Sequence, residues 1–265
     1  MVGLRPTIFF MLRYLDIGNN NFIPSYNLFV GFGIAMAMLF LQYQKPFKTK
    51  TEKEKHKIHL SLIVSILLGF IGAFIFDAYS QNIALTFDNL NQIGLTFLGG
   101  LLSGLMILVI SLKLASLPIL PTLNILAIPF CVAHFFGRLG CFMAGCCFGS
   151  PTKSFLGVTF PIDSLPHNHY HELIKIHPTQ LYESAFVLCL FVFFTKFKTN
   201  NQFYIYILTY SVFRFIIEFI RADDRGTVLN QDIFSPSQII SLLTVILFTA
   251  LIITNKQFQK QTINL

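Results

Sequence analysis

A run of polar residues interrupts one of the most apolar parts of the sequence. The segment YIYILTYSVFRFIIEFIRADD carries them at every third or fourth position: Tyr210, Arg214, Glu218 and Arg221. That spacing places the four side chains on one stripe of a helix. A charged side chain at membrane depth costs a few kcal/mol and normally faces a protein interior or a water-filled cavity. The stripe therefore indicates either a structural ion pair between helices or a site for a charged ligand.

The composition is that of a membrane protein. Hydrophobic residues make up 54% of the chain and charged residues 12%, whereas about a quarter of the residues in a soluble protein are charged. Windows of about 20 apolar residues predict seven transmembrane helices, at residues 26–43, 58–79, 94–112, 117–137, 180–194, 202–220 and 236–254. We expect an all-α, polytopic membrane protein with a single membrane domain over residues 1–265. Residues 1–23 are amphipathic and are expected at the membrane interface.

Basic residues predict the orientation of these helices, because short loops rich in Lys and Arg stay in the cytoplasm. The first loop carries six lysines, whereas the next loop, residues 80–93, has no Lys or Arg. The later basic residues that alternation places on the first loop's side are Lys113, Lys196, Lys198, Lys256 and Lys260. The N-terminus is therefore expected outside and the C-terminus in the cytoplasm. Topology also explains most of the net charge of +7, so we expect no nucleic-acid partner.

With this topology, the unusual sequence features gather at the outward ends of the helices. Tyr26 opens the first span, the glycine-rich residues 94–104 open the third, residues 137–138 close the fourth, residues 177–183 open the fifth and residues 214–221 end the sixth. Independent structural polar residues would be scattered over both faces. Their convergence predicts a shared extracytoplasmic cavity.

The segment from His134 to Gly149 is the most irregular in composition. His134 and Arg138 share a helix face, and glycines follow at positions 137, 140, 145 and 149. Such glycines allow close backbone approach, and irregular backbone at membrane depth is tolerated where it is buried or lines a wet cavity. The segment is therefore expected to form a re-entrant or irregular loop, with small-residue helix packing as the alternative. Residues 138–178 as a whole are expected to form a periplasmic arm.

Taken together, these blocks resemble prolipoprotein diacylglyceryl transferases of the bacterial inner membrane, over most of the chain. The resemblance implies transfer of a diacylglyceryl group from phosphatidylglycerol to a cysteine thiol of a lipoprotein precursor at the periplasmic face, with glycerol phosphate departing. Guanidinium groups suit this reaction, because they hold phosphate bidentately without changing protonation. The expected catalytic residues are Arg138, Arg214, His177, Glu218, Tyr210 and Cys146; the expected substrate-binding residues are Tyr26, Gly99, Gly100, Gly149, Arg221, His134 and Cys141. No cofactor or metal is expected.

The sequence departs from the family pattern at three positions. Leu98 stands where the family has a histidine, Cys141 where it has an asparagine and Cys146 where it has a glutamate. Two hypotheses restore activation of the acceptor thiol. His177 or His134 serves as the base, or Cys146 or its neighbour Cys147 acts as a nucleophile or carrier. The alternative is a non-catalytic lipid-binding or thiol- or metal-handling membrane protein of the same fold.

The five cysteines divide into two groups. Cys131 and Cys189 lie in apolar spans and are interpreted as packing residues. Cys141, Cys146 and Cys147 cluster on the expected outer side, where a disulfide between Cys141 and one of the other two is permitted. Packing, redox or nucleophilic chemistry, and metal binding remain open for this group.

Overall fold

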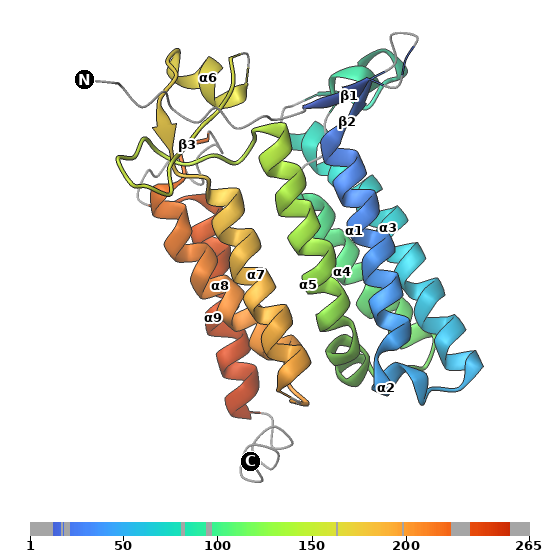
Figure 1. Ribbon diagram of the computed structural model, residues 1–265. Helices are drawn as coiled ribbons and strands as arrows, with labels where there is room; N and C mark the ends of the chain where they lie inside the picture. Colours follow the sequence, from blue (N-terminus) through green and yellow to red (C-terminus); the bar gives the residue numbers. More distant parts are fainter. Residues whose placement is uncertain are drawn as a thin grey trace. The chain divides into compact units, whose positions relative to one another are not determined.

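The computed structural model describes residues 13–16, 18, 22–80, 83–93, 97–162, 164–197, 199–223 and 234–254 (Figure 1). Its α-helices are α1 (Ser25–Tyr43), α2 (Lys45–Lys48), α3 (Glu52–Ser80), α4 (Phe97–Leu114), α5 (Ile119–Ala144), α6 (Leu165–Tyr170), α7 (Thr179–Lys196), α8 (Gln202–Ile217) and α9 (Pro236–Thr254). Two 3₁₀ helices, η1 (Phe87–Gln92) and η2 (Glu218–Ile220), complete the helical part. Strand β1 (Tyr14–Asp16) pairs antiparallel with β2 (Phe22–Pro24), and β3 (Val158–Thr159) with β4 (Lys175–Ile176). Most of the predicted interfacial segment 1–23 lies outside the described residues.

Five helical segments of the described chain are long and apolar enough to cross a membrane: Ser25–Tyr43, Glu52–Tyr79, Ile119–Ala144, Gln202–Ile220 and Pro236–Thr254. They coincide with five of the predicted spans. Large apolar side chains on them are exposed, such as Leu67 of α3 and Leu243 and Ile246 of α9. Water would oppose so much exposed apolar surface, whereas lipid accepts it. The prediction of a mostly helical protein is confirmed, and several of its helices are long and apolar enough to span a membrane.

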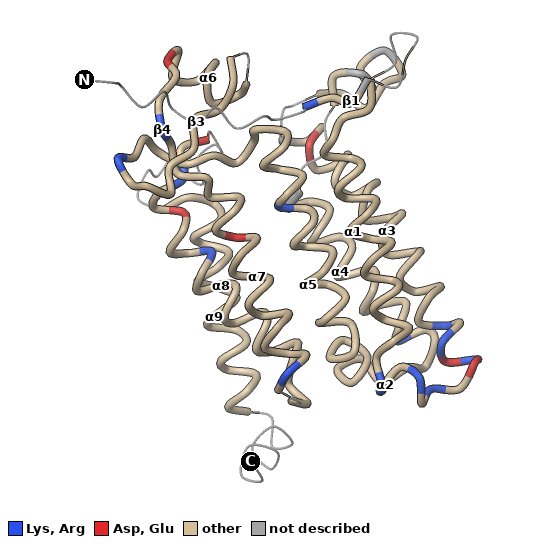
Figure 2. Tube along the Cα trace, viewed as in Figure 1, with Lys and Arg blue, Asp and Glu red and all other residues tan. Residues whose placement is uncertain are grey.

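The described chain forms two compact units. The first comprises residues within Met1–Gln42 and Leu126–Leu265, and the second comprises Tyr43–Ile125. In the second unit α3 packs closely on α4, and glycines make this possible. A Cβ added to Gly72 would lie 2.0 Å from Oγ of Ser103, and one added to Gly99 would lie 2.4 Å from Cβ of Phe76. Only glycine fits at such helix contacts. Lysines and arginines gather along α2 and the start of α3 in Figure 2.

In the first unit, α7, α8 and α9 lie side by side (Figure 1). Buried residues of α5, α7 and α8 form one hydrophobic core that includes Ile128, Val187 and Tyr206. Cys131 belongs to this core, whereas Cys189 is exposed. Helix α1 packs on α5 through Gly33, whose added Cβ would lie 2.8 Å from Cβ of Phe136. These contacts hold α5, α7 and α8 together as the frame of the candidate site.

The expected irregular loop begins later than predicted. Helix α5 continues through Gly137 and Gly140 to Ala144, and both glycines keep helical backbone. Gly140 allows Tyr26 of α1 to approach the helix closely. The helix stops at Gly145, whose φ of 73° ends helical geometry. The chain that follows contains β3, α6 and β4 and has its own small core of Phe142, Phe148, Phe160 and Ile176.

Candidate functional site

Three helices carry the polar side chains of the site. Helix α5 supplies His134 and Arg138 one turn apart, α7 supplies Glu183 near its start, and α8 supplies Tyr206, Tyr210 and Arg214 at intervals of four residues. The helix repeat places the members of each set on one face. The arginines and the glutamate are buried. Buried charges persist only where partners compensate their loss of water.

Glu183 lies at the centre of the cluster, and its side chain is 0% exposed. Its Oε2 contacts Nη2 of Arg138 at 2.8 Å and accepts a hydrogen bond from the Tyr210 hydroxyl at 2.9 Å. Its Oε1 contacts Nη1 of Arg221 at 3.3 Å. One carboxylate therefore compensates two guanidinium groups that come from different segments of the chain.

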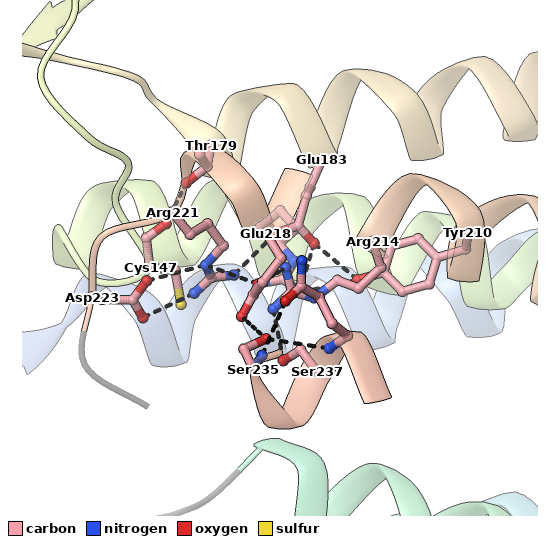
Figure 3. A network of polar contacts seen from close by, with 12 residues as sticks. Cys147, Thr179, Glu183, Tyr210, Arg214, Glu218, Arg221, Asp223, Ser235 and Ser237 are labelled. Atoms are coloured by element: carbon pink, nitrogen blue, oxygen red, sulfur yellow. Dashed lines mark hydrogen bonds and ion pairs between the residues drawn. The ribbon is translucent and has the colours of Figure 1, made fainter. Parts of the chain in front are cut away.

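A second carboxylate, Glu218, extends the network (Figure 3). Its Oε2 contacts Nη1 of Arg214 at 2.6 Å and Nε of Arg221 at 3.9 Å, and its Oε1 accepts a hydrogen bond from Ser235 at 2.7 Å. Nη2 of Arg214 donates to Oγ of Ser237 at 3.0 Å. The ion pairs therefore run in one chain from Arg138 through Glu183, Arg221 and Glu218 to Arg214.

Arg221 is fixed by a third carboxylate. Its Nε and Nη2 contact the two carboxylate oxygens of Asp223 at 3.1 and 2.9 Å, in a bidentate arrangement. Burial raises the pKa of Asp223 to about 6, although the charge of Arg221 opposes this shift. Planar pairing of this kind sets the orientation of the guanidinium as well as its position.

A backbone crossing at Gly149 places Arg221 beside the cluster. The Gly149 amide donates to the carbonyl of His177 at 2.9 Å, and the Ser150 amide donates to the carbonyl of Ile220 at 2.8 Å. A Cβ on Gly149 would lie 2.7 Å from the His177 carbonyl oxygen and 2.8 Å from that of Ile220. Gly149 is thus required by the close approach of three chain segments, one of which leads directly into Arg221.

His134 closes the other end of the network. Nε of Arg138 donates to its Nε2 at 3.3 Å, and its Nδ1 lies 2.6 Å from the Tyr206 hydroxyl. Because an arginine has no acceptor, Nε2 must be the accepting nitrogen, which assigns the ring proton of a neutral imidazole to Nδ1. The lone pair that would take up a substrate proton is therefore engaged by Arg138 in this arrangement.

Three thiols lie beside this network. The Sγ atoms of Cys141, Cys146 and Cys147 are within 4.8 Å of one another. Hydrogen bonds from the other two thiols, together with the positive charges of Arg221 and Arg138, hold the pKa of Cys147 well below its ordinary value. All five cysteines lie among the described residues, and none forms a disulfide.

The structure brings together most of the residues that the sequence singled out. Arg138, Arg214, Glu218, Tyr210, Arg221 and His134 share the network. Tyr26 packs at Gly140, and the surroundings of its hydroxyl include Arg138 and the three clustered cysteines. The His177 ring contacts the Tyr182 hydroxyl at 3.1 Å.

The glycines predicted to bind substrate in the third span belong to the second unit. There Gly99 and Gly100 face Phe76 and Ala73 of α3, which gives them a packing role. The side chain of Leu98 lies outside the described residues.

Sequence reasoning missed Glu183, Tyr206, Ser235 and Ser237 as members of the network. Glu183 had a clear signal, since it is a carboxylate inside a predicted membrane span, as informative as the arginines. Tyr206 lies one turn before Tyr210 on the same stripe. No comparable signal marks the two serines, because their role depends on how α9 packs against α8.

Comparison with known proteins points to one family. The sequence model of the family described as prolipoprotein diacylglyceryl transferase matches residues 14–254. The chain is 35% identical over 159 residues to a phosphatidylglycerol–prolipoprotein diacylglyceryl transferase of Clostridium tetani, covering 58% of this chain and 61% of that protein. It is 32% identical over 180 residues to the protein of the same name from Clostridium botulinum, covering 66% and 68%. A Finegoldia magna protein of that name is 29% identical over 196 residues, covering 72% and 71%.

The local matches differ in extent. The chain spans 61% of the Clostridium tetani relative, and 44% of a second such enzyme from Clostridium perfringens, to which it is 38% identical. The family model, in contrast, includes every described residue of the ion-pair network, from His134 to Ser237. The chain belongs to the prolipoprotein diacylglyceryl transferase family.

Proposed function

We propose that this protein transfers the diacylglyceryl group of phosphatidylglycerol to a cysteine thiol of a lipoprotein precursor. The observation that carries the proposal is the buried chain of ion pairs joining Arg138, Arg221 and Arg214, in a member of this family. The names of its relatives supply the substrates. A merely lipid-binding protein of the same fold is the less favoured alternative.

The reaction requires stabilisation of a departing phosphate. The acceptor's sulfur forms a bond to the glyceryl carbon, the bond from that carbon to the phosphate oxygen breaks, and glycerol phosphate leaves with the electron pair. The thiol proton passes to a base. Guanidinium groups aimed at the phosphate offset its developing charge.

The carboxylates prepare the arginines for this role. Glu183, Glu218 and Asp223 fix the orientation of the three guanidiniums before any ligand arrives, so little side-chain entropy remains to be lost when a phosphate binds. We assign head-group binding to Arg138 and Arg214, and the positioning of both to the bridge through Arg221.

The group that accepts the proton of the acceptor thiol has several candidates. His134 is inside the network but must release its bond from Arg138 before it accepts a proton. His177 lies at the backbone crossing, with its ring on Tyr182. Cys146 and Cys147 are further candidates for activating the acceptor thiol, and Tyr26 and Gly149 are proposed to shape the substrate site beside them.

The protein is proposed to lie in the bacterial inner membrane as a single domain with seven transmembrane spans. Its N-terminus and the site would face the periplasm, and its C-terminus would face the cytoplasm. Helices α4 and α7 supply the two spans beyond the five long apolar ones. Helix α7 is less apolar because it carries Gln180, Glu183 and Ser184, all of which are buried. Because α5 runs to Ala144, the arm predicted over residues 138–178 would begin after that residue and lie over the site.

Complementation tests the activity. The gene is expressed in a bacterium depleted of its own transferase, and the mass of a major lipoprotein is measured. The proposal predicts restored growth and a lipoprotein that carries the added diacylglyceryl mass. Good membrane expression without that added mass would reject a lipoprotein cysteine as the acceptor.

A further inference from the structure

Three thiols gather at the end of α5, and the proposed reaction does not explain why all three lie together. Cys141 lies in the last turn of the helix, and Cys146 and Cys147 lie in the turn that follows. Their Sγ atoms are all within 4.8 Å of one another, and none is oxidised to a disulfide. Spacing along the sequence favoured a disulfide or simple packing, but spacing does not show that all three sulfur atoms converge on one point.

The backbone around the thiols is built to hold this convergence. Gly145 and Cys147 both have positive φ, 73° and 63°. A non-glycine residue in this conformation has a higher free energy, which contacts with its surroundings must offset. Helix α7 provides these contacts. Gln180 donates to the carbonyl of Cys146, and Thr179 donates to the carbonyl of Cys147, each at 2.5 Å. Both donors are 0% exposed, so the turn is fixed by two buried side chains.

Positive charges also lie near the thiols. Arg138 and Arg221 both interact electrostatically with Cys147, and Arg138 also interacts with Cys141. A complex of three thiolates with a monovalent or divalent cation is negatively charged overall. The two guanidiniums would compensate that charge in a site where Cys141 is buried and the other two cysteines are partly buried.

We propose that Cys141, Cys146 and Cys147 form a binding site for a soft, thiophilic metal ion, Cu(I) or Zn(II). Thiolate ligands select these ions. Cu(I) is satisfied by three sulfurs, and Zn(II) completes a tetrahedron with water. Zinc–sulfur bonds of about 2.3 Å place the sulfurs about 3.8 Å apart, so the observed group needs to contract by only about 1 Å at most. The site stands on this geometry whether or not the transfer reaction is confirmed.

Metal binding by the purified full-length protein in detergent tests the proposal. The protein is prepared under nitrogen with a phosphine reductant, its free thiols are counted by alkylation and mass spectrometry, and Zn(II) or Cu(I) is titrated against a chromophoric chelator. The variants Cys141→Ser, Cys146→Ser and Cys147→Ser are compared with Cys189→Ser, which removes an exposed cysteine outside the group. Cys141→Ala is included because Cys141 is buried, and thermal unfolding confirms that each variant is folded.

The expected result is one ion per chain for the wild type and for Cys189→Ser. Each substitution within the group should weaken binding more than about 100-fold, since even the loss of an outer-shell partner weakens a metal site by 10- to 100-fold. The affinities measured in separate titrations with Zn(II) and with Cu(I) identify the preferred ion. Equal affinity in all the variants, absence of binding by the reduced wild type, or a disulfide within the group that resists the reductant would each overturn the proposal.

Discussion

At the scale of single residues, the site is a set of buried charges that depend on one another. Glu183 compensates Arg138 and Arg221 at once, whereas Glu218 serves Arg214 and, at longer range, Arg221. Removing one partner from such a network leaves another charge buried and unpaired, which costs more than the pair itself contributes. The carboxylates should therefore matter as much as the arginines.

Glu183→Gln keeps the shape of the side chain and removes its charge. We expect the free energy of unfolding to fall by about 3 kcal/mol, because two guanidiniums lose their shared counter-ion. Chemical unfolding of the purified protein in detergent measures this. Glu52→Gln is the matched control: Glu52 also pairs with a cation, but its side chain is 88% exposed, and such pairs contribute little. Equal losses in the two variants would contradict a central role for Glu183.

Arg214→Lys tests geometry separately from charge. The variant keeps the positive charge but loses the planar fork that contacts Glu218 and Ser237. If the fork stabilises the departing phosphate, the rate of transfer should fall roughly 100-fold or more while the protein stays folded. The exposed Arg13 gives the control substitution Arg13→Lys. A wild-type rate in Arg214→Lys would exclude Arg214 from bidentate binding of the head group.

At the scale of elements, backbone contacts place these side chains. The crossing of residues 148–150 with His177 on one side and with the end of η2 on the other carries Arg221 to Glu183. On the opposite side of the same turn, α7 holds the carbonyls of Cys146 and Cys147. Hydrogen bonds therefore hold residues 146–150, just after α5, between α7 and the end of η2.

Gly149→Ala should damage this crossing. The new Cβ would lie under 3.0 Å from two carbonyl oxygens, so the segments must separate and Arg221 must move. We expect a lower thermal midpoint and at least about a tenfold loss of transfer activity, of the size that misplacing a catalytic group causes. Gly137→Ala is the control, because a Cβ at Gly137 meets nothing within 4 Å and alanine favours the helix. If Gly149→Ala has the same thermal midpoint and transfer activity as Gly137→Ala, the crossing at Gly149 does not position Arg221.

Hydrophobicity was enough to locate the long helices, but not their ends. Helix α3 begins at Glu52, well before the apolar window that starts at Ile58, because Thr51 and Glu54 form a reciprocal capping box through side-chain and backbone hydrogen bonds. Helix α5 runs past Gly137 for the packing reasons given above. Tyr210 and Arg214 share a face of α8, as the period predicts, but the prediction of one helical stripe is wrong for the other two residues. Helix α8 ends at Ile217, Glu218 lies in η2, and Arg221 follows η2 with extended backbone. Ion pairs, and not a helix face, bring Arg221 to the network. The convergence of three cysteines depends on long-range contacts with α7, which spacing does not reveal.

At the scale of the whole molecule, the remaining question is how the chain sits in the membrane. The positive-inside rule predicts a cytoplasmic loop around Lys53 and an external loop around Leu85, both exposed in the structure. In a background in which the five native cysteines are replaced by serine, a membrane-impermeant maleimide applied to intact spheroplasts should label Leu85→Cys and leave Lys53→Cys unlabelled. Lysed cells provide the control in which both react. Labelling of Lys53→Cys in intact spheroplasts would reverse the orientation and move the site to the cytoplasmic face.

The most direct test of the central claim is the reaction itself. Purified protein is incubated with phosphatidylglycerol vesicles and a peptide that carries the cysteine of a lipoprotein precursor, and the products are identified by mass spectrometry. The account predicts a peptide that carries a diacylglyceryl thioether and one glycerol phosphate released per peptide modified, with both products lost in Arg138→Lys. An unmodified peptide in the presence of folded wild-type protein would contradict it.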